Sequence, residues 1–388
     1  MPSGSANTKK AGFEMETEID TRVSGLRKEL ELRRLDAVIV LIEENRYYLS
    51  GFSAKNALPD EVAGVLLLGR QKKSLITNSI YLEQARAECA NWQTVLADDG
   101  FEHSLAVLLK QWNAGRVGFE SSGFTYERHS RLCRKLRDTA PEVRLEACSD
   151  LVENLRLIKS DQEIRATCRA LETAEQAFTI FLEKLKPGMT EKQAAWELEK
   201  AMRELGADSM SFEPIVAAGP NSALPHARPG SRVIREGEPV LCDWGARLDG
   251  YCSDTSRTVV LGRPDRKFLE MFSTVKQAQQ KAIAGIRQGR KASDVDRLAR
   301  EFIDAGPFKG KFFHGLGHGT GLAVHEQPRL GSRSAFSLKE GMLVTVEPGI
   351  YLPGWGGVRL ENQVLVTRED GRVLNRLPIS WNPEDYFV

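Results

Sequence analysis

The segment EPVLCDWGARLDGYCSDTSRTVVLG, residues 238–262, carries two aspartates at a spacing that could bind a metal ion. The Asp-Gly pair at 249–250 lies between two strand-like runs, which is typical of a two-residue hairpin turn. With the turn there, Asp243 faces Ser256, and Asp254 lies two residues from Ser256 on the same face. Two carboxylates on one half-buried face repel each other and lose hydration unless a cation lies between them. The spacing indicates a metal site, with one surface aspartate and one turn aspartate as the open alternative.

A second segment, FFHGLGHGTGLAVHEQPRLG at residues 312–331, holds three of the six histidines of the chain: His314, His318 and His325. Four glycines alternate through it, and each would cost about 1 kcal/mol relative to alanine inside a helix. The segment is therefore not expected to be helical, which argues against a zinc pair of His314 and His318 on one helix face. Glycines around His318 suit a backbone that approaches another group closely. A glycine-rich loop with incidental histidines would give the same pattern.

A third segment, residues 343–367, contributes two glutamates. Residues 344–347 read as an apolar strand that ends in Glu347, where a lone buried carboxylate would be costly. Residues 358–367 read as another strand, and polar residues alternate along one of its faces: Arg359, Glu361 and Gln363. An exposed edge strand would explain Glu361 equally well.

Together the three segments supply four carboxylates and one imidazole: Asp243, Asp254, His318, Glu347 and Glu361. A mainly oxygen ligand set with one nitrogen suits Mn²⁺, Co²⁺, Fe²⁺ or Zn²⁺ better than a structural zinc site, which would favour thiolates. Four negative ligands can hold two divalent ions about 3.5–4 Å apart, an arrangement that activates a shared water.

The chain has 388 residues, of which 41% are hydrophobic and 28% charged, and this is enough for two globular domains. Its net charge of +1 gives no electrostatic case for a nucleic acid or an anionic membrane surface as a partner. No apolar run approaches the roughly 20 residues that span a bilayer, and no signal-peptide pattern is visible. Six scattered cysteines without a CxxC pair suit reduced thiols. We expect a cytoplasmic protein with a disordered terminus at residues 1–15.

Before about residue 155 the chain alternates between apolar runs and polar, helix-forming stretches. A helix is expected around residues 19–34, and further helices near 79–89, 102–112 and 124–137. The expected strands are 37–42, 62–68, 74–77, 92–96, 117–120 and 143–147. This alternation predicts an α/β domain with a mostly parallel sheet and one antiparallel pair.

After residue 155 helix pairs alternate with glycine-rich strands. Apolar residues recur at helical spacing over residues 159–186, and Ser160 with Glu163 forms a capping box at the start. Further helices are expected at 190–204, 265–288 and 292–305, with strand-rich stretches at 211–262 and 311–368. The order is a helix pair followed by strands, twice over, without a sequence repeat.

In this order the motifs resemble those of the creatinase/prolidase family of pita-bread metallopeptidases, the Xaa-Pro dipeptidase and aminopeptidase P group. The matching patterns are D-x-G-A, G-Y-x-S-D-x-T/S-R-T, G-x-G-H-G-x-G-L, E-P-G-I-Y and R-x-E. The segments LRLIKSDQEI and LDAVIVLIEENRYYLSGF also resemble the group. The resemblance implies an α/β creatinase-like N-terminal domain at residues 16–155. It also implies an α+β pita-bread catalytic domain at residues 156–388, with a curved, mostly antiparallel sheet.

The resemblance assigns the five residues above as ligands of two divalent metal ions, with Mn²⁺ expected and Co²⁺, Zn²⁺ or Fe²⁺ as alternatives. It implies hydrolysis of the bond after an N-terminal residue, preferentially in Xaa-Pro peptides, by a hydroxide that bridges both metals. Glu347 would serve both as ligand and as acid/base. His226 and His325 would stabilise the carbonyl oxygen and the tetrahedral intermediate. Arg359 or Arg329 would hold the carboxylate of the substrate or orient a ligand.

The family further implies short proline-containing peptides as substrates and a homodimer as the assembly. Three residues depart from its pattern: Thr255, Ser256 and Thr320. Because Thr255 adjoins a ligand, metal preference could differ. A non-peptide hydrolase or lyase on the same dinuclear metal site stays the alternative. The sequence does not distinguish dipeptidase activity from aminopeptidase P activity. A non-enzymatic binding protein and a metal-free creatinase-like hydrolase are disfavoured by the intact ligand set.

Overall fold

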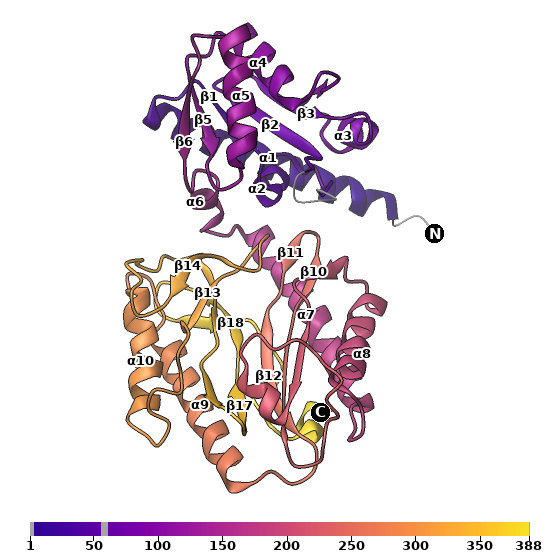
Figure 1. Cartoon of the computed structure of the whole chain (residues 1–388), viewed down its shortest axis with the longest axis vertical. Helices are drawn as coiled ribbons and strands as arrows, with labels where there is room; N and C mark the ends of the chain where they lie inside the picture. Colours follow the sequence, from indigo (N-terminus) through magenta and orange to yellow (C-terminus); the bar gives the residue numbers. More distant parts are fainter. Residues whose placement is uncertain (1–3, 56–60, 388) are drawn as a thin grey trace. The chain divides into compact units, whose positions relative to one another are not determined.

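The structure, a computed structural model, describes the backbone of residues 4–55 and 61–387 and the side chains of residues 17–55 and 61–387. The chain divides into two compact units, Met1–Leu155 and Arg156–Val388, referred to below as the N-terminal and C-terminal units (Figure 1). The predicted disordered terminus, residues 1–15, lies outside the residues whose side chains are described. Among the described helices, none is long and apolar enough to cross a membrane.

The N-terminal unit contains a six-stranded sheet with the strand order β4-β3-β2-β1-β5-β6. Its strands are β1 (Ala37–Val40), β2 (Gly64–Gly69), β3 (Lys73–Thr77), β4 (Gln93–Leu96), β5 (Arg116–Glu120) and β6 (Arg144–Cys148). Its helices are α1 (Gly4–Arg33), α2 (Glu43–Ser50), α3 (Leu82–Glu88), α4 (Phe101–Gln111), α5 (Tyr126–Thr139) and, at the end of the unit, α6 (Glu153–Arg156). The predicted alternation of strands and helices is confirmed.

The direction of the strands differs from the prediction of one antiparallel pair. β1 pairs in parallel with β5, as do β5 with β6 and β3 with β4, but β2 is antiparallel to both β1 and β3. The link between Gly69 and Lys73 is too short for a crossover, so it forces β2 and β3 to be antiparallel. All six residues of β2 are buried, and so its composition does not reveal its direction.

Two helix pairs belong to the C-terminal unit: α7 (Asp161–Lys184) with α8 (Glu191–Glu204), and α9 (Arg266–Ala284) with α10 (Ala292–Asp304). In Figure 1 the two pairs lie on opposite sides of the strands. The predicted capping box of α7 is present, because Ser160 Oγ accepts from Glu163 N at 3.2 Å and Glu163 Oε2 accepts from Ser160 N at 3.0 Å. Thr190 and Gln193 form a second capping box on α8.

The strands of this unit form open antiparallel sheets with the orders β11-β10-β7, β12-β9-β8, β14-β13-β15-β18-β19 and β16-β17. After the first helix pair come β7 (Ser209–Met210), β8 (Ile215–Ala218), β9 (Pro239–Trp244), β10 (Ala246–Leu248), β11 (Tyr251–Cys252) and β12 (Thr255–Val260). After the second come β13 (Gly317–Gly319), β14 (Glu326–Leu330), β15 (Leu343–Val346), β16 (Gly349–Leu352), β17 (Gly356–Arg359), β18 (Asn362–Val366) and β19 (Gly371–Val373). The predicted order of helix pairs and strands is confirmed.

The predicted hairpin register is also confirmed. Leu248 faces Tyr251 across the turn, and Asp243 faces Ser256 further along. The turn residues at 249–250 have φ angles of 51° and 80°, the left-handed values that an Asp-Gly pair tolerates.

The prediction of one continuous strand over residues 358–367 is wrong. β17 pairs with β16 and β18 pairs with β15, so the chain changes sheets between them. At the break, Leu360 N donates to Pro348 O at 3.4 Å and Glu361 N donates to Ser256 O at 3.0 Å. Ser256 lies far from Glu361 in sequence, which is why local alternation did not reveal the break.

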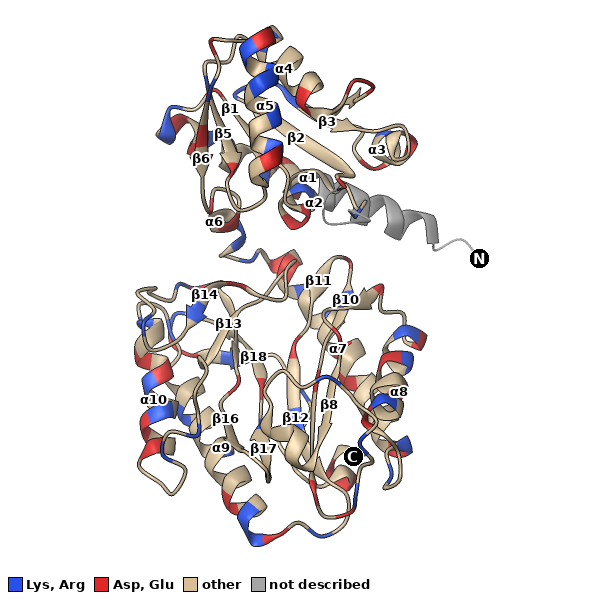
Figure 2. Ribbon diagram, in the orientation of Figure 1, with Lys and Arg blue, Asp and Glu red and all other residues tan. Residues whose placement is uncertain are grey.

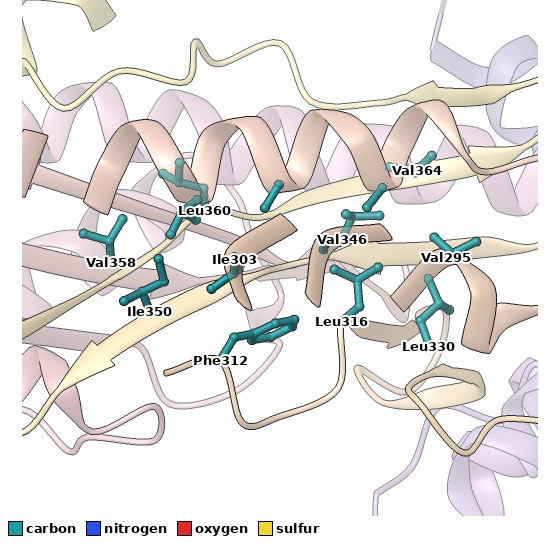
Figure 3. Packing of buried hydrophobic residues seen from close by; sticks show 14 of the residues in the cluster. Val295, Ile303, Phe312, Leu316, Leu330, Val346, Ile350, Val358, Leu360 and Val364 are labelled. Atoms are coloured by element: carbon teal, nitrogen blue, oxygen red, sulfur yellow. The ribbon is translucent and has the colours of Figure 1, made fainter. Parts of the chain in front are cut away.

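Helices α9 and α10 pack on the strands through a large hydrophobic cluster (Figure 3). Val295 and Ile303 of α10 meet Val346 of β15 and Val364 of β18 in this cluster. The fully buried apolar side chains fix the positions of the strands whose polar faces point the other way. Figure 2 shows charged residues mainly along helices and loops, with acidic positions also on the central strands.

Candidate metal and active site

The two aspartates lie at an interruption of the β9–β12 hairpin. Asp243 is paired with Ser256 in the ladder, and Asp254 directly precedes β12. Between β9 and β10 the chain passes through Gly245, where a Cβ would lie only 1.9 Å from Ser253 O. A side chain at 245 would push the two strands apart, so this glycine lets both aspartates reach one side of the hairpin.

His318 is held in the middle of the short strand β13. A Cβ on Gly317 would lie 2.1 Å from Thr345 O, and one on Gly319 would lie 2.1 Å from Gln327 O. The predicted need for close backbone approach around His318 is confirmed. His318 Nδ1 lies 3.0 Å from Gly319 O, which favours a proton on Nδ1. Its Nε2 consequently faces the carboxylates.

His318 Nε2 lies 3.3 Å from Glu347 Oε1 and 3.6 Å from Asp254 Oδ2. Asp254, His318 and Glu361 each place one ligand atom within 4.8 Å of the others, close enough to hold a metal ion. Glu347 follows the end of β15, and Glu361 occupies the break between β17 and β18. Strand ends therefore position both glutamates.

Hydroxyl groups hold the glutamates in place. Ser256 Oγ donates to Glu361 Oε2 at 2.7 Å, and Thr345 Oγ1 donates to Glu347 Oε1 at 3.2 Å. Thr345 Oγ1 also accepts from His318 N at 3.0 Å, which links two of the predicted site residues through one side chain.

Asp243 has one satisfied oxygen and one unsatisfied oxygen. Its Oδ2 accepts from Arg359 at 2.5 Å. Its Oδ1 is buried without a hydrogen-bond partner among the described residues. A buried carboxylate oxygen without a donor is costly, which indicates that a cation belongs beside it.

Arg359 is only 2% exposed and makes several contacts at once. Besides Asp243, it donates to Ser256 Oγ at 2.9 Å, to Tyr351 Oη at 3.1 Å and to Pro225 O at 3.1 Å. These bonds lock the guanidinium beside Asp243. The sequence identified Arg359 but not its partners.

The electrostatics of the cluster also indicate a missing positive charge. Burial raises the pKa of Asp254 and of Glu361 well above their usual values, and the neighbouring carboxylates raise both further. Burial also raises the pKa of Asp243, against the opposing charge of Arg359. Burial alone would raise the pKa of Glu347 as well, but the neighbouring His318, His314 and Arg359 lower that pKa to about 2. The described cations do not balance the four acids.

A cavity of about 480 Å³ opens onto this cluster and contacts every site residue predicted from the sequence. These residues are Asp243, Asp254, His318, Glu347, Glu361, His226, His325, Arg329 and Arg359. The rings of His318 and His325 meet edge to face, with centroids 4.3 Å apart. Burial and the neighbouring His318 lower the pKa of His325 to about 4, so His325 is neutral at pH 7.

Some residues near the site were missed by sequence reasoning. The sequence argued against His314 as a helical zinc ligand and predicted no other role for it, but His314 lines the cavity and its Nε2 lies 2.9 Å from Tyr351 Oη. Thr345 and Tyr351 lie inside the third segment, two residues before Glu347 and four after it. Alternation along residues 343–347 could have placed Thr345 on the face of Glu347.

Open antiparallel sheets, a buried carboxylate–imidazole cluster and an adjoining cavity indicate a protein that binds metal ions beside a cavity for a small ligand. Comparison with known proteins makes this class specific. Residues 163–368 match metallopeptidase family M24, and residues 22–158 match the creatinase/prolidase N-terminal domain. The chain belongs to metallopeptidase family M24, and its fold is a creatinase N-terminal domain followed by a pita-bread catalytic domain.

Relatives and solved structures cover nearly the whole chain. It is 36% identical to the uncharacterized peptidase YqhT of Bacillus subtilis (strain 168), over 89% of this chain and 94% of that protein. It resembles the Xaa-Pro dipeptidase from Bacillus anthracis with a TM-score of 0.88 and 35% identity, over 94% of this chain and 99% of the other. It also resembles the X-Pro aminopeptidase from Thermotoga maritima MSB8 with a TM-score of 0.81 and 32% identity, over 89% and 97%.

Proposed function

We propose that the protein is an exopeptidase that hydrolyses the bond after an N-terminal residue, preferentially in short Xaa-Pro peptides. The observation that carries the proposal is the buried, donor-poor carboxylate cluster around Asp243 Oδ1 at the floor of a cavity. Both the dipeptidase and the aminopeptidase among the similar structures act on Xaa-Pro bonds according to their names, which supports proline as the second residue.

The donor set fits two divalent ions, held by the carboxylates and the imidazole: Asp243, Asp254, His318, Glu347 and Glu361. Oxygen-rich ligation with one nitrogen favours Mn²⁺, with Co²⁺, Fe²⁺ and Zn²⁺ as alternatives. When bound, such ions would supply a hydroxide nucleophile at neutral pH and would polarise the scissile carbonyl.

Glu347 acts as the proton carrier in this proposal. Glu347 lines the cavity beside His318, where its carboxylate would take a proton from the attacking water and pass it to the leaving nitrogen. His226 and His325 line the same cavity and donate hydrogen bonds to the carbonyl oxygen as negative charge develops there. Neutral His325 can donate such a hydrogen bond without adding a positive charge to the cavity.

The two arginines take separate roles. Arg359 is buried and bonded to Asp243, Ser256 and Tyr351, so its role in this proposal is to position Asp243. Arg329 is exposed at the cavity wall, where it can receive the substrate carboxylate. We further propose a homodimer in the cytoplasm, which light scattering of the purified protein and fractionation of cells would test.

The test uses metal-stripped protein restored with Mn²⁺, Co²⁺ or Zn²⁺ and offered Ala-Pro, Ala-Pro-Ala and Ala-Ala. Chromatography follows release of the N-terminal alanine. We expect metal-dependent cleavage of the proline peptides and little cleavage of Ala-Ala. If folded, metal-loaded protein cleaves no peptide, the proposal fails and a non-peptide hydrolase or lyase on the same metal site takes its place.

A further inference from the structure

A second cavity, of about 720 Å³, continues from the active-site cavity. The two share His314, Gly315, Arg329 and Gly331 as wall residues. None of the five proposed metal ligands lines the second cavity. It therefore extends away from the reacting bond, beyond Arg329, toward the loop at residues 332–336 that follows β14.

The walls of this second cavity are cationic without an acidic counterpart. They carry Arg300, Arg329 and Arg333, and none of the lining residues is an aspartate or glutamate. Arg300 is already committed, because it forms two bonds with Asp296 at 2.8 and 2.9 Å and two with backbone carbonyl groups. Two guanidinium groups are left for a ligand.

Arg329 and Arg333 are both exposed. Their side chains make no ion pair or hydrogen bond with any other residue in the described ranges 17–55 and 61–387. Two seryl hydroxyls, Ser332 and Ser334, and the 62% exposed ring of Phe313 complete a wall that offers hydrogen bonds and apolar contact. Such a mixture suits a peptide better than a purely ionic ligand.

We propose that this second cavity is a subsite for residues of the peptide beyond the second, with Arg333 as the receptor for the C-terminal carboxylate of a tripeptide. The inference rests on the proposed exopeptidase function and deepens it. Arg329, on the wall common to both cavities, receives the carboxylate of a dipeptide, which ends nearer the ligands. Arg333, in the second cavity alone, meets a chain longer by about 3.5 Å per extended residue.

The consequence is a substrate class of Xaa-Pro peptides with three or more residues and a free C-terminus, in addition to dipeptides. A guanidinium recognises a carboxylate through paired N–H donors, and removing one such contact weakens binding by about tenfold. Arg333 is therefore a specificity-determining residue for length, outside the groups that act on the scissile bond.

The experiment compares the metal-loaded wild type with Arg333→Gln on Ala-Pro, Ala-Pro-Ala and Ala-Pro-Ala-amide. We expect Arg333→Gln to lower kcat/KM for Ala-Pro-Ala about five- to tenfold through KM. Cleavage of Ala-Pro and of the amide should stay unchanged. Arg235→Gln, which removes the same charge from an exposed position outside both cavities, should alter none of the three.

A binding measurement separates this inference from the proposed function. Calorimetry with Pro-Ala, the product of tripeptide cleavage, should show weaker binding to Arg333→Gln, and Pro-Ala-amide should bind both proteins equally. If Ala-Pro is cleaved but Arg333→Gln leaves tripeptide kinetics and Pro-Ala binding unchanged, the subsite is refuted and the exopeptidase function stands. Absence of cleavage of every peptide would instead overturn the proposed function, and the subsite with it.

Discussion

Each unit buries carboxylates, but the two units treat them differently. In the N-terminal unit, the buried Glu120 accepts hydrogen bonds from Leu41 N at 2.6 Å, Ile42 N at 2.8 Å and Asn45 Nδ2 at 2.6 Å. In the C-terminal unit, four carboxylates crowd around one imidazole, and Asp243 Oδ1 has no donor among the described residues. The same chemical group is satisfied by the fold in one place and left short of donors in the other.

The contrast distinguishes a structural carboxylate from one that awaits a ligand. Glu326 shows a third arrangement, since it is buried between Arg156 and Lys159 and so has its counter-charges supplied by the protein. These cations lower the pKa of Glu326 in spite of its burial, whereas burial and neighbouring acids raise that of Asp254. Burial alone therefore does not indicate a metal site, but burial without donors or counter-charge does.

The largest predicted effect comes from neutralising carboxylates in the two units. Asp243→Asn or Glu361→Gln should abolish metal-dependent turnover, a loss beyond the roughly 10–100-fold contribution of outer-shell partners. Glu120→Gln is the matched control, with the same chemical change in the other unit. Below pH 4.5, where Glu120 is protonated, it should cost about 1–3 kcal/mol of stability, and at every pH it should keep metal content and turnover per folded molecule. Metal analysis and peptide assays measure both, with circular dichroism to verify folding.

Full turnover in either cluster variant would contradict the assignment of these residues as ligands. Loss of bound metal in Glu120→Gln would contradict the distinction between the two units, because it would show that the buried Glu120 of the N-terminal unit affects the metal site.

The sequence predicted the features that depend on local geometry and missed those that depend on contacts between distant segments. The register that brings Asp243 opposite Ser256 depends on one local turn, and the sequence contains that turn. The glycines around His318 are likewise visible in the sequence, and the close backbone approach that they suggested is present at Gly317 and Gly319. Both features depend on short-range geometry.

Long-range partners were not predictable from the sequence. The break at Glu361 depends on Ser256 O, more than a hundred residues earlier, and Arg359 reaches Pro225 O from a similar separation. The direction of β2 was also hidden, since its residues are buried on both faces. Partners brought together by tertiary contact leave no periodic trace in either segment.

The next largest effect is expected at Glu326. Glu326→Gln leaves Arg156 and Lys159 buried without their counter-charge, and breaking such a buried pair costs about 3–5 kcal/mol. Glu340→Gln is the control, because its pair with Arg368 is exposed to solvent and contributes little to stability. Urea unfolding measures the two differences. Equal, small losses of unfolding free energy would mean that the protein relaxes around Arg156 and Lys159. The ion pairs of Glu326 would then contribute little to stability.

A smaller effect concerns pH and Glu120. Burial raises its pKa to about 7 in spite of its donors, whereas an unfolded glutamate titrates near 4.5. The folded form therefore binds the proton more tightly, so stability from this group is full below pH 4.5 and falls as the pH rises to 7. The loss is at most about 3 kcal/mol. Glu120→Gln should not show this loss of stability. The difference in urea midpoint between variant and wild type should therefore change between pH 4.5 and 7. A gap that does not change with pH would mean that the donors fully compensate burial.

The smallest effect is expected at the start of α7, where Ser160 and the carboxylate of Glu163 form the capping box. Glu163 Oε2 accepts from Ser160 N, and Ser160 Oγ accepts from Glu163 N in return. Ser160→Ala removes only the second bond and should cost about 1 kcal/mol, the usual worth of an N-cap. Thr190→Ala on α8 is the matched control, with the same capping box further from the units' boundary. Both variants should retain metal and turnover, because their carboxylate or amide partners keep other contacts. If Ser160→Ala lost activity while Thr190→Ala did not, the start of α7 would help to shape the active site. Glu163 could then no longer be classed as a purely structural carboxylate.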